Sequence, residues 1–188
     1  GLDISASAIK LLELSRDDGG YVVESYGVEP LPENTVVEQN IVDVEAVAEA
    51  IKRLQASTQF KSKTAAVAVA GSAVITKTIE VPASLKENQI EEQLLMDADQ
   101  YIPYPLDEVA LDFQVLAATA RSEDMVDVLI AACRQEHIES RQAALELSGL
   151  NPEVIDIEAH CVQRAIALDL ELFTRDPALG VPDVLAIL

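Results

Sequence analysis

The chain begins with Gly1-Leu2-Asp3-Ile4-Ser5-Ala6-Ser7-Ala8-Ile9-Lys10-Leu11-Leu12-Glu13-Leu14. Small and polar residues at 5–7 separate two apolar runs, which predicts a strand at 1–4, a turn, and a second strand at 8–14. The segment 16–20 contains Asp-Gly and Gly-Gly, and it predicts a hairpin turn into a third strand at 21–28. The chain therefore opens as a meander of three strands.

A helix and a buried strand are expected after this meander. Asp43 is placed to cap the helix, because an aspartate side chain accepts hydrogen bonds from the first free amides. The apolar residues of that helix recur on one face, at Val44, Val47, Ile51 and Leu54. The small apolar run at 65–70, which ends at Gly71, is typical of a strand covered on both faces. This order predicts an α/β fold that opens like a ribonuclease-H-like layer.

The segment 72–150 is expected to form a smaller subdomain inserted into that layer. Its strand, helix, strand and strand are predicted at 73–81, 84–101, 109–117 and 125–132. Ser84 is expected to cap the helix, and Pro103 and Pro105 to end it. A further helix is predicted from Gln135 to about 148, ended by Gly149. The predicted organisation is a first subdomain of residues 1–71 and 151–188 and an inserted subdomain of residues 72–150.

The last stretch predicts a short strand at 152–157, an amphipathic helix at 158–173 and a buried strand at 184–188. A hydrophobic strand needs neighbours for its apolar faces and its backbone groups. We therefore expect the sequence to be a fragment that stops as a second lobe begins, and we expect residues to precede Gly1.

Composition and charge narrow the class of protein. The 188 residues contain 49% hydrophobic but only 4% aromatic residues, so the core must consist mainly of Ala, Val, Ile and Leu. With 33 acidic and 13 basic residues the formal net charge is −20, which argues against nucleic acid as a partner. No apolar run approaches the ~18 residues needed to cross a bilayer. No secretory signal is visible, so a cytoplasmic location without a membrane span is expected.

Part of the negative charge is local. Between residues 84 and 112 the only cation is Lys86, and the acidic residues are Glu87, Glu91, Glu92, Asp97, Asp99, Asp107, Glu108 and Asp112. Such a surface is either merely solvated or steers a basic partner.

Three segments together resemble the PilM family of type IV pilus assembly proteins, which is related to FtsA and the actin-like ATPases. They are residues 1–14, residues 65–72, and the specific run Asp99-Gln100-Tyr101-Ile102-Pro103-Tyr104-Pro105-Leu106-Asp107-Glu108-Val109. Their order agrees with the family along the whole chain. The resemblance implies an actin-like subdomain 1A carrying an inserted FtsA-type subdomain 1C, and a role in pilus biogenesis and twitching motility.

The resemblance also implies ligands. The family binds ATP with Mg²⁺ between two lobes, and the matching phosphate loop places Asp3 near the metal, with Ser5, Ala6 and Ser7 facing the phosphates. Ser5 stands where many such loops have Gly. The second phosphate loop and the adenosine pocket are absent from the sequence, so this chain alone is not expected to hold ATP well.

The implied protein partner is the cytoplasmic N-terminal peptide of PilN, held in the groove between subdomains 1A and 1C. Other inner-membrane components of the pilus machine are expected around it, and the chain would be peripheral to the inner membrane through PilN. Ser72, Tyr101 and Tyr104 are expected near the junction of the subdomains, where the tyrosine rings could receive an apolar side chain of the peptide.

Alternatives stay open at the level of the sequence. The chain could belong to an actin-like ATPase that hydrolyses ATP or polymerises as a division-type scaffold, or it could be an acidic peptide-binding module with no nucleotide. Asp3 could simply form a turn, and the 103–105 segment could simply end a helix. Cys133, His137, His160 and Cys161 invite a zinc site, but packing is the preferred explanation.

Overall fold

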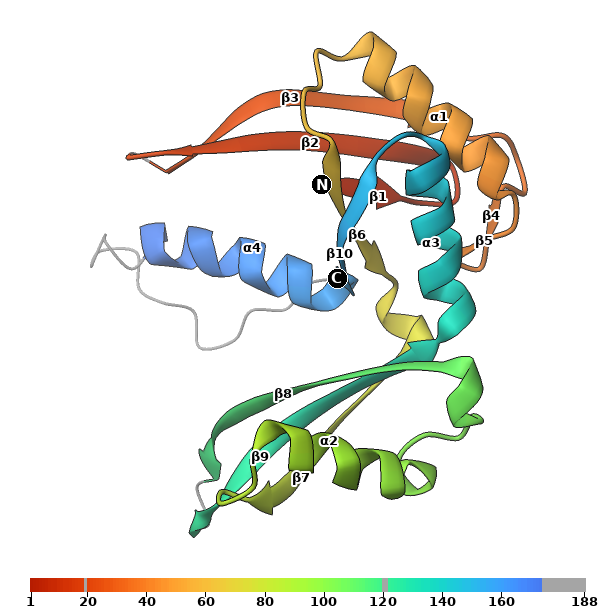
Figure 1. Cartoon of the computed structure of the whole chain (residues 1–188). Helices are drawn as coiled ribbons and strands as arrows, with labels where there is room; N and C mark the ends of the chain where they lie inside the picture. The colour runs from red at the N-terminus through yellow and green to blue at the C-terminus, as the bar shows by residue number, and fades with distance from the viewer. Residues whose placement is uncertain (19, 120–121, 174–188) are drawn as a thin grey trace.

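The chain folds into two bodies, which lie one above the other in Figure 1. A computed structural model describes residues 1–18, 20–119 and 122–173. The upper or first body contains β1 (Leu2–Ile4), β2 (Ala8–Asp17), β3 (Gly20–Pro30), β4 (Val36–Val37), β5 (Asn40–Ile41), α1 (Val44–Ser57), β6 (Thr64–Val69), α3 (Gln135–Leu147), β10 (Asn151–Ile157) and α4 (Glu158–Phe173). The lower or second body contains β7 (Val74–Pro82), α2 (Glu87–Met96), β8 (Val109–Thr119) and β9 (Ser122–Arg134), with short 3-10 turns at Gly71–Ala73, Ala98–Gln100 and Leu106–Glu108.

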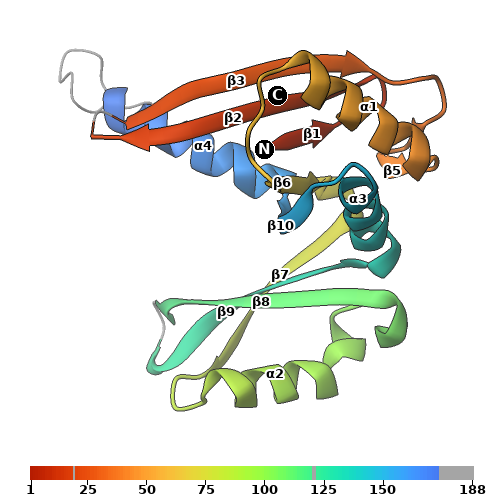
Figure 2. The same ribbon diagram turned by 45° about the horizontal axis from the view of Figure 1, so that its top comes forward.

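The strands of the first body lie in the spatial order β3, β2, β1, β6, β10. The first three form an antiparallel sheet, and β6 pairs with β10 in parallel. β6 lies beside β1 in both ribbon views (Figures 1 and 2), which joins the two sets into one layer. Ile9 and Leu11 pack with α1, while Lys10 and Leu12 point to the opposite face, where α4 lies. The layer therefore has a helix on each face.

Helix α1 is held in place by the same residues from which the helix was predicted. The Asp43 side chain accepts a hydrogen bond from the Ala46 amide at 2.8 Å, which confirms Asp43 as the N-cap. Val47, Ile51 and Leu54 are fully buried against the sheet. Gly27 of β3 permits this close approach, because a Cβ atom there would lie 2.8 Å from Leu54 Cδ1.

The second body has its own sheet and its own core. Its strands lie in the order β7, β9, β8 and are antiparallel throughout. Val81, Val128 and Ile130 point to one face and pack with Ile90 and Leu94 of α2. Figure 2 shows that α2 covers the side of this sheet that faces away from the first body. The opposite side of the sheet is turned toward the first body.

Two details of the predicted elements are wrong. Helix α2 begins at Glu87 and ends at Met96 instead of spanning 84–101, and Lys86 rather than Ser84 is its N-cap. The chain still turns at 82–85, where the Leu85 amide donates to the Pro82 carbonyl. After Met96 it tightens into a 3-10 turn. The small hairpin of β4 and β5 was not predicted at all, and it contains two residues with positive φ, Glu38 and Gln39.

Helix α3 lies within the predicted inserted range 72–150, yet it packs with the first body. Ala144, Leu145 and Leu150 belong to the same core cluster as α1 and the first sheet. The part of that range with a separate core runs from β7 to β9. The exact bounds of the two subdomains stay a prediction, and the strand predicted at 184–188 lies outside the described residues.

Within the ranges that the structure describes, no helix is both long enough and apolar enough to cross a bilayer.

Candidate functional site

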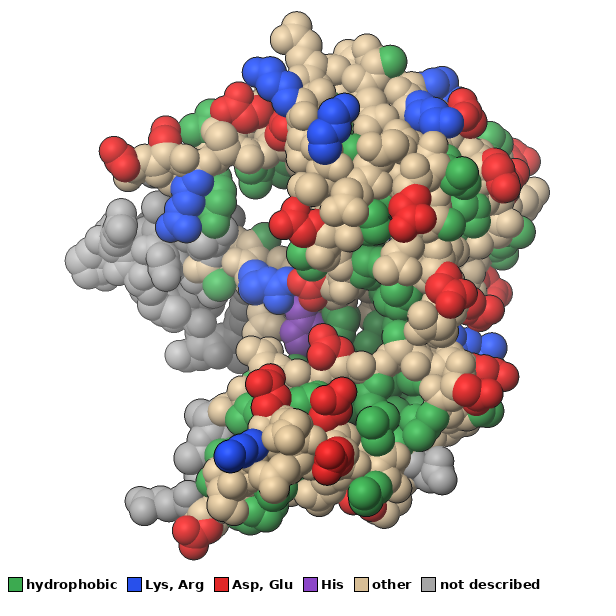
Figure 3. Space-filling model, in the orientation of Figure 1, with side chains coloured by type: hydrophobic (Ala, Val, Ile, Leu, Met, Phe, Trp, Pro, Cys, Tyr) green, Lys and Arg blue, Asp and Glu red, His purple; other side chains and the backbone are tan. Residues whose placement is uncertain are grey.

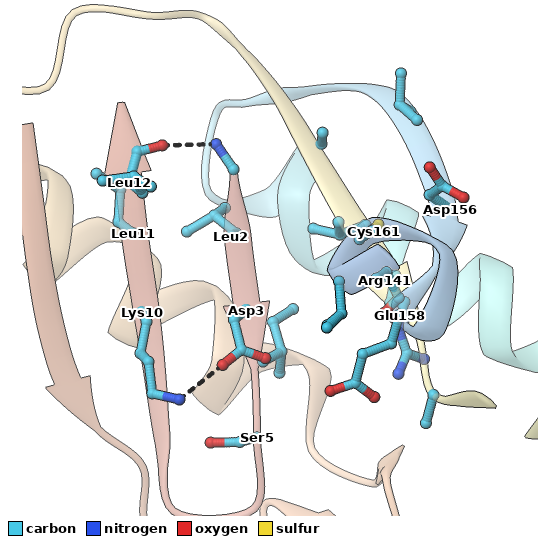
Figure 4. A pocket seen from close by; sticks show the side chains of 18 of the residues that line it. Leu2, Asp3, Ser5, Lys10, Leu11, Leu12, Arg141, Asp156, Glu158 and Cys161 are labelled. Atoms are coloured by element: carbon cyan, nitrogen blue, oxygen red, sulfur yellow. Dashed lines mark hydrogen bonds and ion pairs between the residues drawn. The ribbon is translucent and has the colours of Figure 1, made fainter. Parts of the chain in front are cut away.

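A cavity of about 790 Å³ opens on the face of the first sheet that bears α4. Its walls come from the β1 strand and the turn after it, from β2, β6 and β10, and from α3 and α4. This volume falls in the usual range for small-ligand sites, about 300–1,000 Å³. Figure 4 shows side chains from these separate elements facing the same space.

Asp3 and Lys10 form the charged pair at one wall of the cavity. Asp3 of β1 is paired in register with Lys10 of β2, and Lys10 Nζ lies 2.9 Å from Asp3 Oδ2. The hydrogen bond to Asp3 and its charge raise the pKa of the Lys10 ammonium. Both side chains remain more than half exposed, so a ligand in the cavity can replace either member of this ion pair.

The turn after β1 is closed by Ser5. Its hydroxyl donates to the Ala8 carbonyl at 2.8 Å, and its amide donates to the same oxygen at 3.0 Å. Asp3, Ser5 and Ala6, three of the residues predicted to face a nucleotide, line the cavity. Ser7 is not among the lining residues, and its carbonyl accepts from the Leu31 amide. The role of these residues toward a nucleotide stays a prediction.

Lys10 and Glu158 also line the cavity, although sequence reasoning did not select them. Glu158 begins α4 immediately after β10, at the carboxyl end of a strand, where α/β folds commonly bind ligands. In Figure 4 its carboxylate is directed toward Asp3. Hairpin register would have revealed Lys10, because pairing of the first two strands places position 10 opposite position 3. Beside the turn after β1 the cavity thus brings together two carboxylates, those of Asp3 and Glu158, and the ammonium group of Lys10.

Arg141 of α3 forms the rear of the cavity and is only 3% exposed. Its guanidinium donates to the carbonyls of Ala68 at 2.9 Å, His137 at 2.9 Å and Gln39 at 3.2 Å. These acceptors belong to β6, to α3 and to the turn between β4 and β5. Burial lowers the pKa of the Arg141 guanidinium. The three carbonyl acceptors compensate for the water that the buried charge has lost.

A second, smaller depression of about 180 Å³ lies between the two bodies, and we call it the groove. One side is β10, which pairs only with β6 among the described strands and so leaves its other edge unpaired. The other side is the face of the second sheet opposite α2. Most lining residues are apolar or small, and two are acidic: Val69, Val74, Ala110, Leu111, Asp112, Ala131, Ala132, Cys133, Ile138, Ile155, Asp156 and Ile157.

The three residues predicted to contact a peptide do not line this groove. The Ser72 hydroxyl lies 2.5 Å from Gln39 Oε1, at the connection between the bodies. Tyr101 and Tyr104 pack with the small core around Ala98 and Ile102, covered by Lys77 and Arg134 respectively. A peptide role for them stays a prediction. Sequence alone could not find the groove, because its residues come from six elements.

The cysteine and histidine side chains show no cluster of metal ligands. Cys133 and His137 are buried, and Cys161 lies beside Arg164. No group of three or more His, Cys, Asp or Glu suited to a metal ion occurs in the described part of the chain.

Comparison with known proteins identifies the family. A family model described as type IV pilus assembly protein PilM matches residues 1–187. The chain belongs to the PilM family. A solved structure described as a PilM-PilN type IV pilus biogenesis complex is similar, with 31% sequence identity and a TM-score of 0.79. The match covers 90% of this chain and 50% of that one, so the chain spans about half the length of the PilM-family structure that it matches. The expected actin-like α/β fold is thereby confirmed.

His137 generates a prediction on pH. Burial, followed by the nearby Arg141 charge, lowers the pKa of the His137 imidazole below its ordinary value of about 6.5. The His137 imidazole therefore binds a proton less well in the folded protein than in the unfolded chain. The contribution of His137 to the free energy of unfolding is present above about pH 6.5 and is lost as the pH falls through the lowered pKa. NMR titration should give a His137 midpoint below 6.5, and His137→Gln should lose less stability between pH 7 and pH 5 than the wild type. A midpoint at or above 6.5 would contradict this.

Proposed function

We propose that this chain is the part of a type IV pilus assembly protein that holds the cytoplasmic N-terminal peptide of PilN in the groove and one side of a nucleotide in the cavity. Family membership supports the role in pilus assembly, and the similar PilM-PilN complex supports PilN as the partner. The protein would then be cytoplasmic and would reach the inner membrane through PilN and its neighbours.

The observation that carries the peptide proposal is the edge of β10 that has no partner strand among the described residues and lies across the groove from the second sheet. An extended peptide can add its backbone to such an edge and place alternate side chains in pockets. Here Ile155 and Ile157 stand on the strand itself, and Ile138 of α3 stands beside them. The small residues Ala110 and Ala131 leave space on the facing sheet. The groove therefore fits a short extended segment with apolar side chains.

The cavity fits the phosphate end of ATP with Mg²⁺. Asp3 and Glu158 would hold the metal through its waters, since carboxylate oxygens suit Mg²⁺. Lys10 would face phosphate, and the turn would present the Ala6 amide to it, since the Ser5 amide already donates to the Ala8 carbonyl. When bound, the metal ion would neutralise phosphate charge in the site. The other wall of the nucleotide site would come from a second lobe, as in the two-lobed fold that the family resemblance implies.

Glu158 favours a second candidate, an ATPase that turns over. A carboxylate beside the phosphate end of the cavity can orient a water molecule for attack. Turnover above background by the full-length gene product, lost in Glu158→Gln with ATP binding retained, would establish the ATPase. Equal background rates in both proteins would favour the adaptor.

Peptide binding is tested on α3, which offers a matched pair of positions. Ile138 lines the groove, whereas Leu147 is half exposed and outside it. In the full-length gene product, Ile138→Asp should weaken binding of a synthetic PilN N-terminal peptide at least tenfold, because it places a charge in the apolar wall. Leu147→Asp should leave the affinity unchanged. Calorimetry measures both, and equal affinity of the two variants would contradict the groove as the site.

Nucleotide binding is tested with two exposed lysines. Lys10→Met should lower the affinity for ATP with Mg²⁺ about tenfold, since it removes the cation and leaves the Asp3 charge to repel phosphate. Lys52→Met on α1, which removes a surface ion pair with Glu49, should have no effect. Titration with a fluorescent ATP analogue measures both. An unchanged affinity in Lys10→Met would remove this wall of the cavity from the nucleotide site.

A further inference from the structure

We propose that Asp112 gives the groove a preference for a peptide that carries a basic group beside its apolar residues. This inference rests on the proposed function, because it concerns the ligand of the same groove. It goes further by naming the residue that selects the ligand and the chemistry that it selects.

The register of the second sheet shows which side chains face the groove. Leu111 and Phe113 of β8 point toward α2, where they pack on its core. Asp112 lies between them and therefore points to the opposite face. Its cross-strand neighbour on that face is Ala131, whose own neighbour on β7 is Thr76. Small side chains thus surround Asp112, and its carboxylate is exposed on the groove wall.

Asp112 is the groove carboxylate whose charge is left uncompensated. The other one, Asp156, forms an ion pair with Arg164 of α4. Asp112 accepts a hydrogen bond from the Phe113 amide at 2.8 Å, and no Lys or Arg of the described residues forms an ion pair with it. A single amide donor leaves most of the acceptor capacity of a carboxylate for a ligand.

The rest of the groove-facing side has the same sign of charge. Further along the same strands, Glu80 of β7 lies opposite Asp127 of β9 in the sheet register. Strand alternation places both on the face that bears Asp112. From Val74 to Glu80, from Asp127 to Cys133 and from Ala110 to Gln114, the residues on this face include no Lys or Arg.

These charges distinguish the possible peptides. A purely apolar segment would cover Asp112 without a partner and would bear the cost of removing the carboxylate from water. An acidic segment would be repelled. A Lys or Arg side chain, or an α-amino group, would compensate the charge, while neighbouring apolar side chains fill the wall formed by Ile138 and Ile157.

The test uses the full-length gene product and a synthetic PilN N-terminal peptide, with affinities measured by calorimetry at low and physiological salt. Asp112→Asn should weaken binding about fivefold and reduce the salt dependence. Asp107→Asn, an exposed acidic position of the same body outside the groove, should change neither. A peptide with its basic residues replaced by norleucine should bind Asp112→Asn at least as tightly as the wild type, because it offers the Asp112 carboxylate no partner.

Charge reversal provides a result that a structural effect would not give. Asp112→Lys should bind the natural peptide poorly and recover affinity for a peptide in which a basic residue is replaced by Glu. Wild-type affinity in both Asp112→Asn and Asp112→Lys would overturn the inference, while loss of binding in Ile138→Asp would still support the groove. If the wild type binds no PilN peptide, the proposed function itself fails and the inference fails with it.

Discussion

The buried guanidinium of Arg141 is the contact on which the arrangement of both sites depends. It connects α3 with β6 and with the turn between β4 and β5. That turn contains Gln39, whose side chain contacts Ser72 where the chain passes into the second body. One charged side chain therefore supports the rear of the cavity and the connection between the bodies. A shorter or uncharged residue would remove side-chain hydrogen bonds to three buried or partly buried carbonyl groups, which costs stability.

Strand β10 joins the two sites. Asp156 lines both the cavity and the groove, and Ile155 and Ile157 on either side of it line the groove. The strand ends where α4 begins, so Glu158 enters the cavity one residue beyond the groove. A nucleotide in the cavity and a peptide in the groove would thus rest on the same five-residue stretch of backbone. The two proposed ligands would therefore need no further domain between them.

Local chemistry made much of the fold predictable. Asp43 caps α1, Gly149 with positive φ follows α3, and the longer strands were recognisable from apolar runs, whereas the short β4 and β5 were not. Helix α2 was predicted too long. Ser84 and the prolines at 103 and 105 bound the segment, but they do not show where turn hydrogen bonds stop and helical hydrogen bonds begin. The residues of β1 and its turn that line the cavity, Asp3, Ser5 and Ala6, were recognisable in the sequence. Arg141 and the groove residues were not, because tertiary packing alone brings them together.

The central claim is that an extended peptide binds along β10 between the two bodies. Hydrogen–deuterium exchange of the full-length gene product, with and without the PilN N-terminal peptide, tests it most directly. The account predicts slower exchange confined to the amides of β10 near 155–157 and of the facing strands near 110–113 and 131–133. Protection confined to α2 or to the β2–β3 hairpin, with β10 unchanged, would contradict it.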